Sequence, residues 1–111
     1  MMKSLWTIAA AAAAMGLAMP AHAAVDAAAA QALAKDSGCP KCHAVDKDKK
    51  GPSFKKVAAK YKGQADAEAK LTAFLSKPTK VKLDDGTEEE HKTAGGDAAK
   101  TKNLVQWVLA Q

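Results

Sequence analysis

The sequence contains no arginine and few aromatic or sulfur-containing residues. Only two of its 111 residues are cysteine and 5% are aromatic, and all four methionines lie within the first 19 positions. All seventeen basic residues are lysine, which argues against a nucleic-acid partner because bidentate contacts to phosphate and guanine depend on arginine. Large apolar side chains are also scarce, and small domains with a thin core often need a disulfide, a metal or a bound group to stay folded. The composition therefore predicts one small domain that contains a cofactor.

The first 23 residues predict a secretory signal peptide. Lys3 precedes an uncharged apolar run over residues 5–19, and Ala21-His22-Ala23 has the small-x-small pattern of a signal peptidase site. A transmembrane helix needs about 20 apolar residues, and this run is shorter. We therefore expect residues 1–23 to be removed and residues 24–111 to form an exported, soluble domain without a stable membrane anchor. This domain has sixteen lysines and twelve acidic residues, for a net charge of +4.

Four segments have the pattern of short helices. They span residues 27–35, 54–61, 66–77 and 97–109, where Asp66 and Asp97 suit helix N-caps and Pro78 ends the third segment. Residues 78–96 have no usable periodicity and are expected to form a long loop, and loops of this length in compact domains are commonly functional. No run alternates well enough to predict a strand. The predicted fold class is all-α.

The chemistry of the chain is concentrated in one motif, C-x-x-C-H at residues 39–43. This pattern is the attachment signature of c-type haem. Cys39 and Cys42, separated by one turn of backbone, can both reach the vinyl groups on one edge of a porphyrin and form thioethers with them. The next residue, His43, can then bind the iron from below. The motif predicts one covalent haem c with His43 as the proximal ligand.

Three other interpretations of the motif remain. A thioredoxin-like redox pair has the same C-x-x-C spacing but needs βαβ units that the chain lacks. A structural zinc site could use Cys39, Cys42, His43 and His91, although adjacent ligands at 42 and 43 would strain a tetrahedron. An accidental match is the third, but export, the thin core and flanking helices all agree with haem.

With these motifs in view, the sequence resembles the small class I cytochromes c of bacterial periplasms. The resemblance covers about residues 38–75 and 97–111, including the C-x-x-C-H motif, a turn at 51–54 and the terminal helix. It implies a cytochrome c-like fold of about four helices around a covalent haem. It also implies that the first and last helices cross, with Trp107 against Ala30 and Leu33. Finally, the carbonyl of Pro52 would accept a hydrogen bond from Nδ1 of His43, which would orient the ring.

The chain departs from this family at the distal side of the haem. Family members usually present a methionine in the loop that corresponds to residues 76–96, and this domain has none. The only histidine of the domain besides His43 is His91, about where the family's distal ligand lies. We therefore expect bis-histidine ligation by His43 and His91. An open or water-bound site, or ligation by a lysine such as Lys92, are the alternatives.

The resemblance implies a periplasmic monohaem electron carrier rather than an enzyme. Bis-histidine ligation predicts a low potential, because Met/His ligation raises it. If His91 does not bind, the chain would instead be a haem protein with an open position for NO, CO, O₂ or peroxide. Redox proteins with acidic docking surfaces are the expected partners, and we expect a monomer. Lysines gather near the motif, where they could steer such partners or simply keep the protein soluble: Lys41, Lys47, Lys49, Lys50, Lys55 and Lys56.

Overall fold

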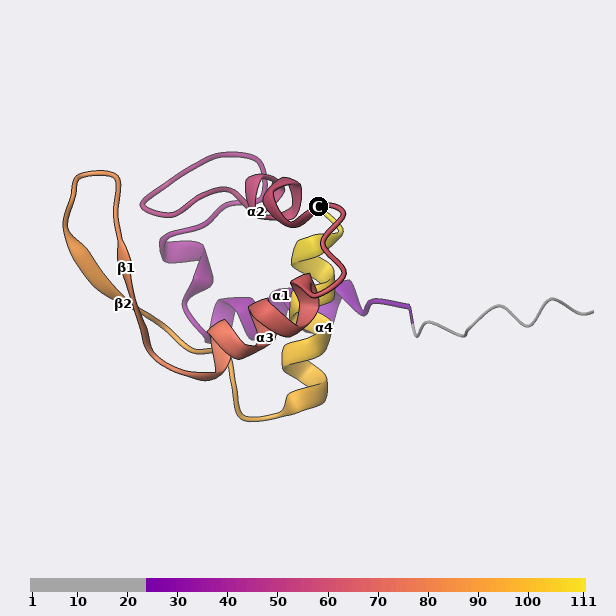
Figure 1. The fold of residues 1–111 in the computed structure, drawn as a ribbon. Helices are drawn as coiled ribbons and strands as arrows, with labels where there is room; N and C mark the ends of the chain where they lie inside the picture. Colours follow the sequence, from indigo (N-terminus) through magenta and orange to yellow (C-terminus); the bar gives the residue numbers. More distant parts are fainter. Residues whose placement is uncertain (1–23) are drawn as a thin grey trace, which may run out of the picture.

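The computed structural model describes residues 24–111, so the predicted signal peptide lies outside the described residues. Four helices, a short 3₁₀ turn and one β-hairpin make up this domain (Figure 1). In the described part of the chain, no helix has the length and apolar character needed to cross a membrane. The elements in chain order are α1 (Ala27–Asp36), η1 (Cys39–Lys41), α2 (Phe54–Tyr61), α3 (Ala67–Ser76), β1 (Thr79–Lys82), β2 (Glu88–His91) and α4 (Ala98–Leu109).

The four helices lie where the sequence predicts them, and polar side chains fix where three of them begin. Asp26 accepts a hydrogen bond from the backbone of Ala29 at 3.0 Å, and Asp97 accepts one from Lys100 at 3.0 Å. Ser53 caps α2 in the same way. Each cap satisfies a backbone N–H that the helix itself leaves unpaired. Asp66 occupies the N-cap position of α3, but its side chain makes no capping bond there.

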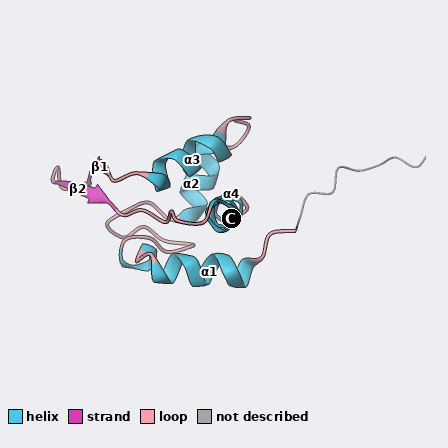
Figure 2. Cartoon of the chain, turned by 90° about the horizontal axis from the view of Figure 1, so that it is seen from below, coloured by secondary structure: helices cyan, strands magenta, loops and turns pink. Residues whose placement is uncertain are grey.

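Helix α4 forms the centre of the domain, with α1 packed on one side and α2 and α3 on the other (Figure 2). The buried residues of α1 in this contact are Ala30 and Ala34, whose small side chains let the two helix backbones approach closely. The Trp107 ring meets Phe54 edge-on with ring centroids 5.4 Å apart. The packing of α1 on α4 confirms the predicted contact of the first and last helices. The buried core consists of Ala30, Ala34, Ala94, Leu104, Trp107 and Val108, and Leu33 packs against it.

The prediction of an irregular loop over residues 78–96 is wrong for residues 79–91, which form two strands and the turn between them. Strands β1 and β2 pair antiparallel there and form a hairpin that projects from the helices (Figure 1). Lys80 lies opposite Glu90 and Lys82 opposite Glu88, so opposite charges face each other across the ladder. Gly86 adopts a left-handed φ of 86° in the connecting turn. The acidic run at 88–90, which lies within the segment predicted to be a loop, is thus an exposed strand.

Candidate functional site

The cysteine segment is a tight turn that begins directly after α1. Gly38 has a φ of 79°, a left-handed conformation that favours glycine, and starts η1. The backbone N–H groups of Cys42 and His43 both donate to the carbonyl of Cys39, at 3.1 and 2.9 Å. This turn holds the two cysteines and the histidine together. Both thiols are free and half-buried, and burial raises the pKa of the Cys39 thiol.

His43 is fixed by the loop that follows it. Its Nδ1 donates to the carbonyl oxygen of Pro52 at 2.6 Å, as the family resemblance implied. A carbonyl can only accept, so Nδ1 carries the hydrogen and Nε2 keeps its lone pair for a metal. The ring stacks on Phe54 with centroids 5.3 Å apart and 21° between the planes. Gly51 lies against the ring, since a Cβ at that position would be 2.6 Å from Cε1 of His43.

His91 lies at the end of β2 and is oriented in the same way. Its Nδ1 donates to the carbonyl of Lys92 at 2.8 Å, which again leaves Nε2 with its lone pair. The ring packs on Phe74, with centroids 4.6 Å apart. Burial lowers the pKa of His91, the hydrogen bond to Lys92 opposes this shift, and the nearby His43 adds to it. The neutral imidazole that metals bind is therefore favoured at neutral pH.

The structure brings the two histidines together, although they come from opposite sides of the site. Their ring centroids are 6.0 Å apart, with 50° between the planes. His43 reaches this place from the turn after η1, and His91 from the hairpin. The pairing of Thr79 with His91 at the base of the hairpin sets the position of the second ring.

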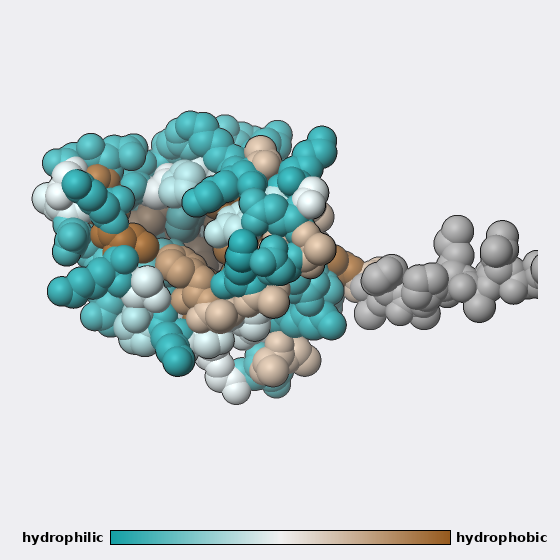
Figure 3. Space-filling view, viewed as in Figure 1, coloured by the Kyte–Doolittle hydropathy of each residue, from teal (hydrophilic) through white to brown (hydrophobic). Residues whose placement is uncertain are grey.

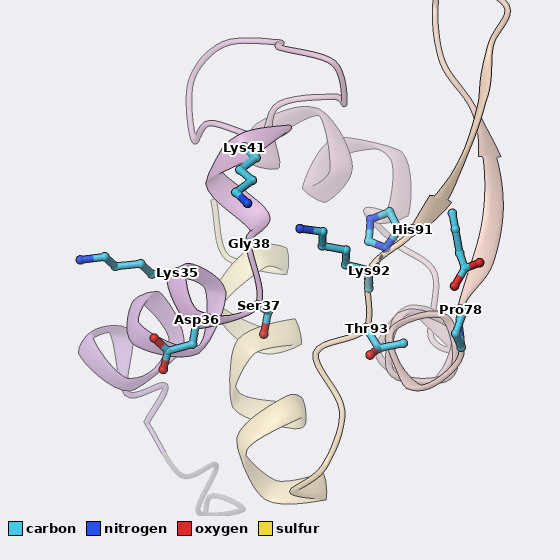
Figure 4. Close-up of a pocket in the computed structure, with 10 residues that line it drawn as sticks. Lys35, Asp36, Ser37, Gly38, Lys41, Pro78, His91, Lys92 and Thr93 are labelled. Atoms are coloured by element: carbon cyan, nitrogen blue, oxygen red, sulfur yellow. Dashed lines mark hydrogen bonds between the residues drawn. The ribbon is translucent and has the colours of Figure 1, made fainter.

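A cavity of about 510 Å³ opens beside this pair (Figure 4). It touches His91 but not His43 or the two cysteines. Lys92, the first residue after β2, extends toward Gly38, and its Nζ would lie 3.2 Å from a Cβ at that glycine. On the face in Figure 3, hydrophilic residues surround a hollowed area where apolar residues show. The cavity is lined by Lys35, Asp36, Ser37, Gly38, Lys41, Pro78, Glu90, His91, Lys92 and Thr93.

Most lysines near the motif are engaged in contacts with the rest of the domain. Nζ of Lys49 donates to the carbonyl of Pro40 at 2.8 Å. Three others form exposed ion pairs: Lys50 with Glu89 at 3.9 Å, Lys55 with Asp46 at 2.7 Å, and Lys56 with Asp48. Lys41 borders the cavity instead.

Two features of the site were missed from the sequence. The hairpin could have been found from Asp85-Gly86, a favoured turn dipeptide. Its strands, however, consist mostly of lysine and glutamate, and without alternating apolar residues they give a weak strand signal. The carboxylate of Asp48 accepts hydrogen bonds from the backbone of Ser53 at 2.8 Å and from Lys56. No local pattern distinguishes this aspartate from the other charged residues of its loop.

The sequence of this chain is similar to those of known cytochromes c. The sequence model of the cytochrome c family matches residues 27–110. Cytochrome c-551 of Pseudomonas aeruginosa is 37% identical over 81 residues, which cover 73% of this chain and 75% of that protein. Cytochrome c-551 of Allochromatium vinosum is 39% identical over 77 residues, or 69% of this chain and 80% of its own length.

Solved structures show the same likeness. The class 1 cytochrome MtoD from Sideroxydans lithotrophicus ES-1 superposes with a TM-score of 0.76 at 53% identity, covering 78% of this chain and 97% of that one. Wild-type cytochrome c552 of Nitrosomonas europaea gives a TM-score of 0.59 at 27% identity, covering 72% of this chain and 96% of its own. The chain therefore belongs to the cytochrome c family, as a class I c-type cytochrome that binds one covalent haem c and carries electrons.

Proposed function

We propose that this cytochrome is a low-potential, bis-histidine electron carrier of the periplasm and not an enzyme. Cys39 and Cys42 would form the thioethers to haem c, and His43 and His91 would bind its iron. The observation that carries the proposal is the placement of two imidazoles whose centroids are 6.0 Å apart. Two rings that bind one ion through nitrogens about 2 Å away have centres about 6 Å apart.

The donor set suits haem c in its chemistry as well as its spacing. Both histidines donate Nδ1–H to a backbone carbonyl. A hydrogen bond of this kind commonly fixes the ring orientation of a metal-bound histidine. The two half-buried thiols lie on one turn with His43. When bound, haem c supplies reversible one-electron chemistry at iron. The protein's part is to hold both imidazoles neutral and oriented in both redox states, so that little has to move when the electron arrives or leaves.

The ligand set and its surroundings argue for a potential at the low end of the family. A second imidazole in place of a thioether favours ferric iron. The distal ligand comes from a hairpin whose strands are mostly exposed. Water and charge near the iron stabilise the more highly charged ferric state relative to a dry apolar site.

An absorption spectrum with and without carbon monoxide tests the ligation. Wild-type protein should be six-coordinate and low-spin in both oxidation states and should not take up carbon monoxide readily. His91→Ala should become high-spin in the ferrous state and bind carbon monoxide. Lys92→Ala is the matched control, because His91 uses the backbone carbonyl of Lys92 and not its side chain. A low-spin spectrum that survives His91→Ala but is lost in Lys92→Ala would assign the distal position to the lysine.

Location and partners form the remaining part of the proposal. The N-terminal leader predicts that the exported protein begins at Ala24, and its intact mass should exceed that of the polypeptide by one haem. Lys41 and Lys92 lie at the cavity beside the histidines, where they could meet acidic groups of a redox partner. We expect the protein to act as a monomer. A mass equal to the bare chain would contradict covalent attachment.

A further inference from the structure

One peptide group connects the proximal histidine to a carboxylate. The carbonyl of Pro52 accepts the hydrogen bond from Nδ1 of His43 at 2.6 Å. The N–H at the other end of the same peptide, that of Ser53, donates to Oδ1 of Asp48 at 2.8 Å. Because a peptide group is planar and rigid, bonds at both of its ends fix how it is turned. Asp48 is therefore linked to His43 through a single peptide group.

The carboxylate is itself held in place from two sides. Its second oxygen, Oδ2, accepts a hydrogen bond from Nζ of Lys56. Lys56 lies in the first turn of α2, and its backbone N–H donates to Oγ of Ser53 at 3.1 Å. The backbone of Asp48 also forms an isolated antiparallel bridge with His43. The side chains of Asp48, Ser53 and Lys56 and the backbone of His43 thus form a connected network of contacts around the Pro52–Ser53 peptide.

The negative charge of the Asp48 carboxylate is the property that can affect the iron. The hydrogen bond from Lys56, and next that from the backbone of Ser53, hold the pKa of Asp48 below its usual value. The carboxylate is an anion at neutral pH. Hydrogen bonds in a chain polarise one another, so an anion on the N–H side makes the carbonyl of the same peptide a stronger acceptor.

We infer that Asp48 is a positioning residue that orients the Pro52–Ser53 peptide and, through it, strengthens His43 as an electron donor to iron and lowers the reduction potential. The inference rests on the proposed role of His43 as the proximal ligand. A carboxylate bonded directly to a metal-bound histidine orients the ring and strengthens it as a donor. Here the peptide relays that effect. A more basic imidazole stabilises ferric iron more than ferrous iron, which lowers the potential.

The test is Asp48→Asn in the haem-loaded protein. Asparagine keeps the shape and an oxygen that can accept from Ser53, but removes the charge. At a fixed solution potential, the ratio of reduced to oxidised haem should rise several-fold. The NMR signal of the His43 Nδ1 hydrogen in the reduced protein should move upfield, because its hydrogen bond to Pro52 weakens.

Asp46→Asn is the matched control. Asp46 lies in the same loop and pairs with Lys55 at 2.7 Å, so this variant makes the same change of charge without altering a contact to the Pro52–Ser53 peptide. It should shift the haem ratio less and leave the His43 signal in place. Equal shifts in the two variants, with the His43 signal unmoved, would overturn the relay. The shifts would then come from the through-space effect of a carboxylate charge on the haem iron.

Two further outcomes separate the inference from the proposed function. Loss of the low-spin spectrum in Asp48→Asn alone would overturn the tuning role and leave a structural one. A wild-type protein without covalent haem, or whose spectrum does not change when His43 is replaced, would instead contradict the proposed ligation.

Discussion

Gly51→Ala offers a sharp test of how tightly the loop holds His43. An alanine Cβ at this position would lie 2.6 Å from Cε1 and 3.0 Å from Nδ1 of His43, and 3.2 Å from the carbonyl oxygen of Cys42. Carbon atoms normally approach to about 3.5–4.0 Å, so the overlap with Cε1 is about 1 Å. The backbone of Gly51 is not in the left-handed region, so alanine itself is not strained there. The effect comes from the contacts with the histidine ring and with the Cys42 carbonyl.

Overpacking of this kind costs about 1–3 kcal/mol. For a domain of this size each kcal/mol lowers the melting temperature by about 4–8 °C. Thermal unfolding of the haem-loaded protein, followed by circular dichroism, measures the loss, and the absorption spectrum reports whether the ligand field has changed. Gly95→Ala is the control, because its Cβ would meet Cα of Ser76 at 3.6 Å and the carbonyl oxygen of Leu75 at 3.7 Å, both ordinary contacts. A Gly51→Ala protein as stable as Gly95→Ala, with the wild-type spectrum, would refute the tight packing of the loop on His43.

Three other predictions concern stability. Trp107→Ala should cost about 3–5 kcal/mol in chemical unfolding, because the ring fills the contact among α1, α2 and α4, and Trp107→Phe should recover much of it. Asn103→Ala should cost about 1–3 kcal/mol, because it removes two hydrogen bonds to the backbone of Asp26, at 2.9 and 2.8 Å; an unchanged unfolding midpoint would contradict this. The lowered pKa of Asp48 means that its stabilising contribution is present above its ordinary pKa of 3.8 and is lost as pH falls through the lower, folded-state value. The difference in melting temperature between wild type and Asp48→Asn should therefore shrink below pH 3.8, whereas a constant difference would exclude the linkage.

The sequence alone was enough to predict the helices and the proximal half of the site. Apolar residues at helical spacing and aspartate or serine caps are local signals, and the observed helix ends differ from the predicted ones by about one residue. The C-x-x-C-H motif is equally local, because its three functional side chains lie within one turn of backbone. The contact of α4 with α1 was implied by the resemblance to class I cytochromes c, in which an aromatic of the last helix packs on the first, and Trp107 and the alanines of α1 fit that role.

Three features depended on the tertiary structure. The hairpin of β1 and β2 is held by cross-strand pairing of lysine with glutamate, which leaves almost no apolar alternation in the sequence. The 6.0 Å separation of the two imidazole centroids exists because the base of the hairpin, where Thr79 pairs with His91, brings His91 to His43. The link from Asp48 to His43 passes through a backbone peptide, so no side-chain pattern records it. Sequence determined which groups can bind a haem because attachment chemistry is local; the placement of the two imidazoles beside each other is a long-range property, which only the folded chain decides.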